Sequence, residues 1–155
     1  MYSSDAADRF IVGGIALRYE SQGGASWELI AEQILCIGEA TNESGPVDDD
    51  WRLCFVTDAN GAWLEGSLHA EARNEALQWL SVRLGCSFEV KLANAPPFRS
   101  RVMWPVRLLE RPLFEYQVAP LRRLFSRTAR QLGCKPVAAV QSVHPDVLER
   151  LCSVN

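Results

Sequence analysis

Residues 51–66 read WRLCFVTDANGAWLEG, in which two runs of aromatic and branched residues flank an Asn-Gly pair. Strand-forming residues on both sides of Asn-Gly are the strongest short-range indication of a β-hairpin, because a type I′ turn requires positive φ at both central residues. The sequence therefore predicts two antiparallel strands that reverse at Asn60-Gly61.

The register of this hairpin predicts which of its faces is buried. A turn at Asn60-Gly61 sets Phe55 opposite Gly66 and Leu53 opposite Leu68. Side chains alternate across a strand, so each face collects every second residue. One face is apolar and carries Leu53, Phe55, Leu64 and Leu68. The other is mixed and carries Arg52, Cys54, Val56, Trp63, Glu65 and Ser67. We interpret the hairpin as core scaffold whose mixed face is partly covered by another element, and Trp63 as a candidate interface residue.

The segments around the hairpin predict an antiparallel sheet and a helix. Residues 9–20 are strand-forming, and 21–26 form a turn. Residues 26–38 are ambiguous between one helix and two short strands, and we favour the strands because strand-forming segments surround them. Residues 71–84 carry an apolar stripe at helical spacing and end at Gly85, a typical C-terminal cap. Residues 88–92 alternate apolar and polar side chains, as an extended segment does.

The composition is that of an ordinary globular domain. The chain has 155 residues, 48% hydrophobic and 23% charged, and no apolar run of about 18 residues that would span a membrane. The N-terminus carries acids where a signal peptide would carry bases, so we expect a cytoplasmic protein. Five scattered cysteines, an odd number without a Cys-x-x-Cys pair, are interpreted as small buried residues.

The charge is distributed unevenly along the chain. Residues 1–97 hold 15 acids and 6 bases, whereas residues 98–155 hold 4 acids and 10 bases, which together give the net charge of −3. The change falls at Ala95-Pro96-Pro97, a linker signal. We therefore predict a sheet-plus-helix domain at 1–95 and a basic extension at 96–155 that docks on it.

The extension is predicted to be a helix, a strand and a second helix. Residues 119–133 form the first helix, 137–143 the strand, and Pro145 opens the last helix. We expect residues 98–116 to be extended or short-turn chain that lies over the first domain. The first helix is basic; its arginines are Arg122, Arg123, Arg127 and Arg130. These arginines are candidate interface residues, either for the chain itself, for a sister subunit or for another protein.

No motif predicts a catalytic residue, a metal site or a cofactor. His69 and His144 are isolated, and no Gly-rich phosphate loop occurs. Ser142, His144 and Asp146 lie too close in sequence for a catalytic triad and are more simply a helix cap. The acidic run 48–50 lacks calcium-loop spacing and is interpreted as a solvated loop.

The order of segments over residues 15–92 resembles the bacterial pleckstrin-homology-like domains. The residues that carry the resemblance are IALRYES, WELIAEQILCIGEATNE, the hairpin DDDWRLCFVTDANGAWLEGS and the helix EARNEALQWLSVRLGC. The resemblance implies an α+β fold, with a partly open antiparallel barrel or curved sheet capped by a helix, and a role in binding or assembly. The turn SQGGAS lacks the basic cluster of phosphoinositide-binding relatives, which argues against lipid binding by the barrel.

We therefore expect a non-catalytic interaction or assembly module that binds a protein or a second copy of itself. The overall acidic balance disfavours nucleic acid and anionic membrane surfaces as partners. Two alternatives remain open. One is an enzyme whose site is built from ordinary residues, and the other is a binder of anionic surfaces that uses the Arg-rich helix.

Overall fold

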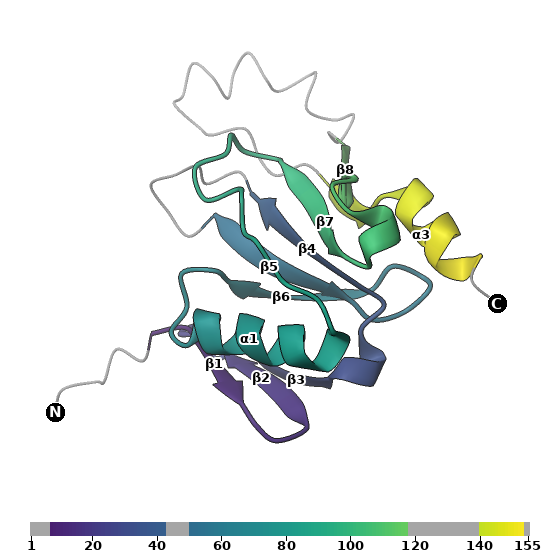
Figure 1. The fold of residues 1–155 in the computed structure, drawn as a ribbon. Helices are drawn as coiled ribbons and strands as arrows, with labels where there is room; N and C mark the ends of the chain where they lie inside the picture. The colour runs from purple at the N-terminus through teal and green to yellow at the C-terminus, as the bar shows by residue number, and fades with distance from the viewer. Residues whose placement is uncertain (1–6, 43–49, 118–139, 154–155) are drawn as a thin grey trace, which may run out of the picture.

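The computed structural model describes residues 7–42, 50–117 and 140–153, which form a mixed α+β fold (Figure 1). The strands are β1 (Arg9–Val12), β2 (Ala16–Glu20), β3 (Ser26–Ile30), β4 (Cys36–Thr41), β5 (Trp51–Val56), β6 (Trp63–Ser67), β7 (Ser100–Trp104), β8 (Phe114–Gln117) and β9 (Val140–Val143). The helices are α1 (Arg73–Leu84) and α3 (Pro145–Cys152), and short 3₁₀ turns span Ala31–Gln33 and Val106–Leu108. The predicted α+β class is confirmed.

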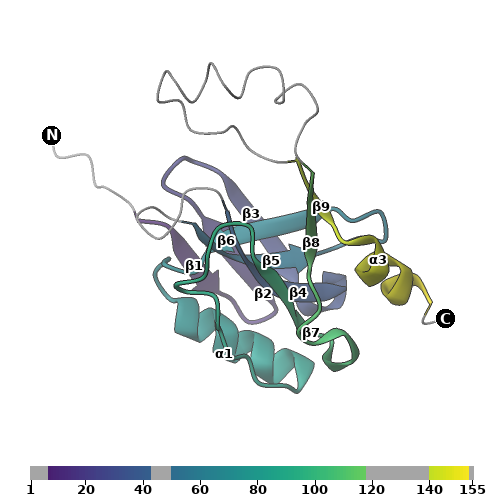
Figure 2. The same cartoon turned by 90° about the horizontal axis from the view of Figure 1, so that it is seen from above.

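The described strands form three antiparallel sheets. Their orders are β1-β2-β3, β6-β5-β4-β7 and β8-β9. The four-stranded sheet is the middle layer, with α1 and the three-stranded sheet toward one side and β8, β9 and α3 toward the other (Figures 1 and 2). Each face of the middle sheet therefore packs against a different partner, and the chain builds two apolar cores.

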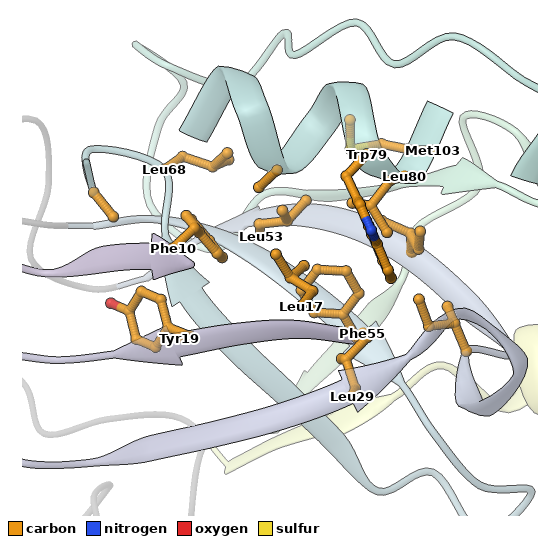
Figure 3. Packing of buried hydrophobic residues seen from close by; sticks show 14 of the residues in the cluster. Phe10, Leu17, Tyr19, Leu29, Leu53, Phe55, Leu68, Trp79, Leu80 and Met103 are labelled. Atoms are coloured by element: carbon orange, nitrogen blue, oxygen red, sulfur yellow. The ribbon is translucent and has the colours of Figure 1, made fainter. Parts of the chain in front are cut away.

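The larger core lies between the middle sheet, the three-stranded sheet and α1 (Figure 3). Phe55 and Leu53 project into it from β5, Leu17 from β2 and Leu80 from α1, and all four are fully buried. The apolar hairpin face predicted from the sequence is thus the face that builds this core.

The smaller core lies on the opposite face of the middle sheet. Cys54 and Val56 of β5 meet Phe114 of β8 and Val143 of β9 there, together with Val147 of α3. This contact confirms that another element covers the mixed hairpin face. The final helix also confirms its prediction: it begins at Pro145 and turns its apolar side inward.

No strand ladder joins β3 and β6, and side-chain hydrogen bonds connect the two sheets at this seam instead. The Trp27 indole N–H donates to the Glu65 carbonyl oxygen at 2.9 Å, and the Ser67 N–H donates to the Tyr19 hydroxyl at 3.0 Å. Gly66 is required between them, because a Cβ there would lie 2.9 Å from the Tyr19 and Phe10 rings. The three-stranded sheet therefore packs against the middle sheet without completing a closed barrel.

The register of the hairpin strands differs from the prediction by two residues. Phe55 pairs with Leu64, not Gly66, and Leu53 pairs with Gly66, not Leu68. The cause is a reversal centred one residue earlier, on Ala59-Asn60: the Gly61 N–H donates to the Asp58 carbonyl oxygen at 3.2 Å, and the Asp58 carboxylate accepts the N–H groups of Asn60 and Ala62. A shift of two residues preserves the face of every side chain, so the burial prediction survives the register error.

The ambiguous segment 26–38 consists of two strands, β3 and β4, joined by a single 3₁₀ turn, as favoured from the sequence. Helix α1 begins at Arg73, two residues after the predicted start, and ends at Leu84, where Gly85 caps it as predicted. Residues 98–116 contain β7, which pairs with β4 and forms one edge of the middle sheet. Residues on both sides of the predicted boundary at 95/96 therefore share one sheet.

Candidate interaction surface

Glu39 is a fully buried carboxylate at the centre of a polar cluster, and both of its oxygens are hydrogen-bonded. One carboxylate oxygen accepts from Arg101 Nε at 2.5 Å and the Lys91 N–H at 2.7 Å. The other accepts from Trp51 Nε1 at 2.8 Å and the Leu92 N–H at 3.2 Å. Glu39 is fully buried, so no solvent or substrate reaches it. The cluster fixes the chain that follows α1 onto the middle sheet.

Arg101 extends this cluster toward the surface. Its guanidinium pairs with Glu110 at 2.8 Å and also donates to the Glu89 carbonyl oxygen. Lys91 Nζ lies 3.1 Å from the same Glu110 carboxylate, and its hydrogen bond, with Arg101 nearby, lowers the pKa of Glu110. A buried ion pair satisfied in this way positions the backbone and leaves no group free to react.

Two of the four described cysteines, Cys36 and Cys54, have environments that suppress thiol chemistry. Burial raises the pKa of Cys36 to about 12, and burial together with nearby Glu65 raises that of Cys54 well above its usual range. The thiolate is the reactive species, so both side chains are inert in the folded protein. Both pack in the smaller core, which agrees with their interpretation as small buried residues. Cys86 is half-buried and Cys152 is exposed, contrary to that interpretation, and Cys134 lies outside the described residues.

The two histidines and the described part of the acidic run make contacts that support the fold. His144 caps α3 by accepting the Asp146 N–H at its Nδ1 atom, which confirms the predicted cap. His69 is exposed, with its ring against Trp51 at 5.6 Å between centroids. Asp50 is buried, contrary to the predicted solvated loop, while 48 and 49 lie outside the described residues. Within residues 7–42, 50–117 and 140–153 no three His, Cys, Asp or Glu side chains gather as metal ligands.

Of the five predicted interface residues, the structure describes Trp63 alone. Arg122, Arg123, Arg127 and Arg130 lie outside the described residues. Trp63 is half-buried on β6, its ring 5.1 Å from the Phe114 ring between centroids and its indole N–H 3.3 Å from Glu65. Trp63 thus contributes to the smaller core, and its interface role remains a prediction.

A different surface gathers exposed apolar side chains around α1 and the β1–β2 turn. Val82 on α1 and Ile15 in the turn are each 71% exposed, and Val12 at the end of β1 is 39% exposed. Beside them lies an open hollow of about 430 Å³. The hollow is lined by Val12, Glu75, Gln78, Trp79, Val82 and Arg83. We call Val12, Ile15, Trp79, Val82 and Arg83 the α1–turn surface.

Arg83 joins the two elements of this surface. Its guanidinium donates to the Gly14 carbonyl oxygen in the β1–β2 turn and lies over the Trp79 ring, 5.4 Å from the centroid. A guanidinium over an indole face is an attractive arrangement that keeps the side chain in place. Trp79 is itself buried, and its indole N–H has no hydrogen-bond partner among the residues described.

The outer face of the three-stranded sheet is charged, in contrast to the apolar α1–turn surface. Arg9 pairs with Glu20 at 2.6 Å, and Arg18 lies 3.6 Å from Glu20 and 3.7 Å from Glu28. We call these four residues the charge ladder. Its charges are exposed and mutually neutralised, which suits a solvated face.

The sequence contained one signal of the α1–turn surface. Val82 lies outside the apolar stripe of its helix, so it is an apolar residue on a face that is otherwise polar. Ile15 is similarly isolated beside Gly13-Gly14. The contact between helix and turn could not be inferred, because it depends on how β1 packs beside α1.

No protein-family model matches the chain, and comparisons with curated proteins and with solved structures found no match. Among the described helices, neither is long and apolar enough to cross a membrane.

Proposed function

We propose that the protein is a non-catalytic interaction module with a PH-like core, and that it binds another protein chain through the α1–turn surface. The observation that carries the proposal is the pair Val12 and Val82, exposed apolar residues that line the hollow over Trp79, with exposed Ile15 next to Gly14, which Arg83 contacts. Exposed apolar side chains gathered in one place, rather than scattered singly, are typical of protein-binding surfaces.

The residue types on the α1–turn surface support this function. Trp and Arg are the side chains most enriched at interface hot spots, and Trp79 and Arg83 are already held in one arrangement. A side chain that is pre-positioned loses little conformational freedom on binding. The unpaired indole N–H of Trp79 disfavours folding, and departures of this kind concentrate at functional sites.

The PH-like core is proposed from the arrangement of the sheets. Two antiparallel sheets pack face to face around Phe55 (Figure 3), with a helix along one side and no strand ladder between β3 and β6. Within the described residues Glu39 is fully hydrogen-bonded and the Cys36 thiol is inert, while the helix side carries the apolar surface. We propose that the module works in the cytoplasm, where its free thiols would persist.

The experiment is the native size of the protein in extracts of cells that produce it. Wild-type chain should elute larger than its monomer, and Val82→Asp should elute as the monomer because a charge replaces the apolar contact. Arg18→Ser on the charge ladder is the matched control and should elute like wild type. Monomeric elution of the wild type, or no response to Val82→Asp, would contradict the proposal.

A further inference from the structure

The outer edge of β1 is open at one residue. The Gly13 N–H donates to the Ala16 carbonyl oxygen at 2.9 Å, which makes these two residues a hydrogen-bonded pair of the β1–β2 ladder. Such pairs alternate in an antiparallel ladder, so Val12, opposite Leu17, is a non-hydrogen-bonded pair. The N–H and C=O groups of Val12 therefore point away from β2.

The chain itself begins to pair with this edge and then leaves it. The Phe10 N–H donates to the Glu71 carbonyl oxygen at 2.9 Å, and the Glu71 N–H donates to the Asp8 carbonyl oxygen at 2.8 Å. Glu71 thus runs parallel beside Arg9 for a single bridge, after which the chain turns into α1 at Arg73. In the described part of the chain, no backbone group pairs with the outward N–H and C=O of Val12.

The outward backbone groups of Val12 lie beside the hollow. Val12 and Phe10 are two residues apart, so their side chains lie on the same face of β1, and Phe10 is buried beneath α1. A residue paired with Val12 would project its side chain to that face as well. There it would meet the hollow lined by Trp79 and Val82.

The charges around the hollow select the occupant further. Glu75 lines the hollow and has no ion pair within the residues described, whereas Arg83 is held by Gly14 and Trp79. Arg83 keeps its positive charge but its guanidinium is already engaged, so Glu75 is the charged side chain of the hollow that has no partner in the described residues. An occupant with a basic side chain near its apolar one would be complementary to Glu75.

We infer that the α1–turn surface binds an extended peptide segment of a partner protein, which pairs with Val12 at the edge of β1. One apolar side chain of the segment fills the hollow over Trp79, and a basic side chain faces Glu75. This inference rests on the proposed function and specifies its partner. Main-chain hydrogen bonds supply affinity in this mode, and the pocket beside the edge supplies specificity.

The test uses the full chain and a displayed library of random 12-residue peptides, from which the strongest binder is synthesised and titrated. We expect Val12→Pro, which removes the outward N–H, to weaken binding about tenfold, the equivalent of about one hydrogen bond. Val12→Ala keeps the N–H and should weaken binding less. Proline is compatible with an edge strand whose N–H faces outward, and a melting curve checks the fold of each variant.

A second measurement leaves the protein unchanged. Peptides methylated at one backbone nitrogen at a time should lose affinity at the single residue that faces Val12 and not at its two neighbours. Failure to enrich any peptide, binding indifferent to Val12→Pro, or uniform tolerance of methylation would overturn strand pairing. The proposed function would still stand if Val82→Asp changed the native size, and both would fall if it did not.

Discussion

The two sides of helix α1 differ in role: one side packs in the core and stabilises the fold, and the other lies on the surface that we propose for binding. On the inner side, Ala76 and Leu80 are completely buried in the larger core. On the outer side, Gln78 and Val82 are exposed beside the hollow. The inner side chains are explained by burial alone, whereas exposure of Val82 brings the fold no comparable stability. This comparison suggests separate measurements for stability and for binding.

The largest expected effect is at the centre of the larger core. Phe55→Ala should lower the free energy of unfolding by about 3–5 kcal/mol, because it deletes a fully buried aromatic ring. Urea unfolding followed by tryptophan fluorescence measures the change. A loss below about 1 kcal/mol would contradict the position of Phe55 between the two sheets.

Breaking the buried ion pair should come next. Glu39→Gln leaves the Arg101 guanidinium buried without its carboxylate, and the free energy of unfolding should fall by about 3 kcal/mol. Glu28→Gln on the charge ladder is the matched control and should leave stability unchanged within error, because its ion pair is exposed and 3.7 Å long. Equal effects of the two substitutions would disprove the distinction between a structural and a solvated pair.

Leu80→Ala and Val82→Ser compare the two sides of α1 directly. Leu80→Ala should lower the free energy of unfolding by about 2–5 kcal/mol, since it opens a cavity in the core. Val82→Ser should change it by no more than about 0.5 kcal/mol, because its side chain is already in water. The same urea titration measures both. A large loss for Val82→Ser would mean that the outer side serves the fold after all.

The smallest expected effect is a loss of folding stability at alkaline pH. Burial and the hydrogen bond to Asp8 raise the pKa of Tyr19 to about 12, above its unfolded value of about 10. The folded protein therefore holds this proton more tightly, so the contribution of Tyr19 to stability is complete below pH 10 and is lost as the pH rises toward 12. Tyr19→Phe should reduce the loss between these pH values in a series of urea titrations. Burial raises the pKa of Tyr116 to about 12 as well, so part of the loss should remain.

The sequence was sufficient for local structure and for burial. Alternation predicted the apolar face of the hairpin, and Gly85 marked the end of α1. The exact register was missed because Asp58 competes for the backbone of the turn, a contact that the Asn-Gly pattern does not encode. Strand β7 was described only as extended, because Arg101 interrupts its apolar residues. Its charge is balanced by Glu39, 62 residues earlier in the chain, and by Glu110.

The candidate site was harder to predict than the fold. The attention given to Trp63 and the arginines followed residue type, whereas the α1–turn surface depends on contacts between segments about 70 residues apart, such as Arg83 and Gly14. Composition and periodicity cannot report a contact of this kind. An exposed valine on the polar side of a helix was the single indication, and a lone exposed apolar residue is common on protein surfaces.

The most direct test of the central claim is photo-crosslinking in the producing cells, with a benzophenone amino acid placed at position 82 and, as a control, at position 28 of the charge ladder. We predict a discrete crosslinked protein from position 82 and none from position 28, since only the first lies on the α1–turn surface. Crosslinks from position 28 alone, or from neither position, would contradict the account.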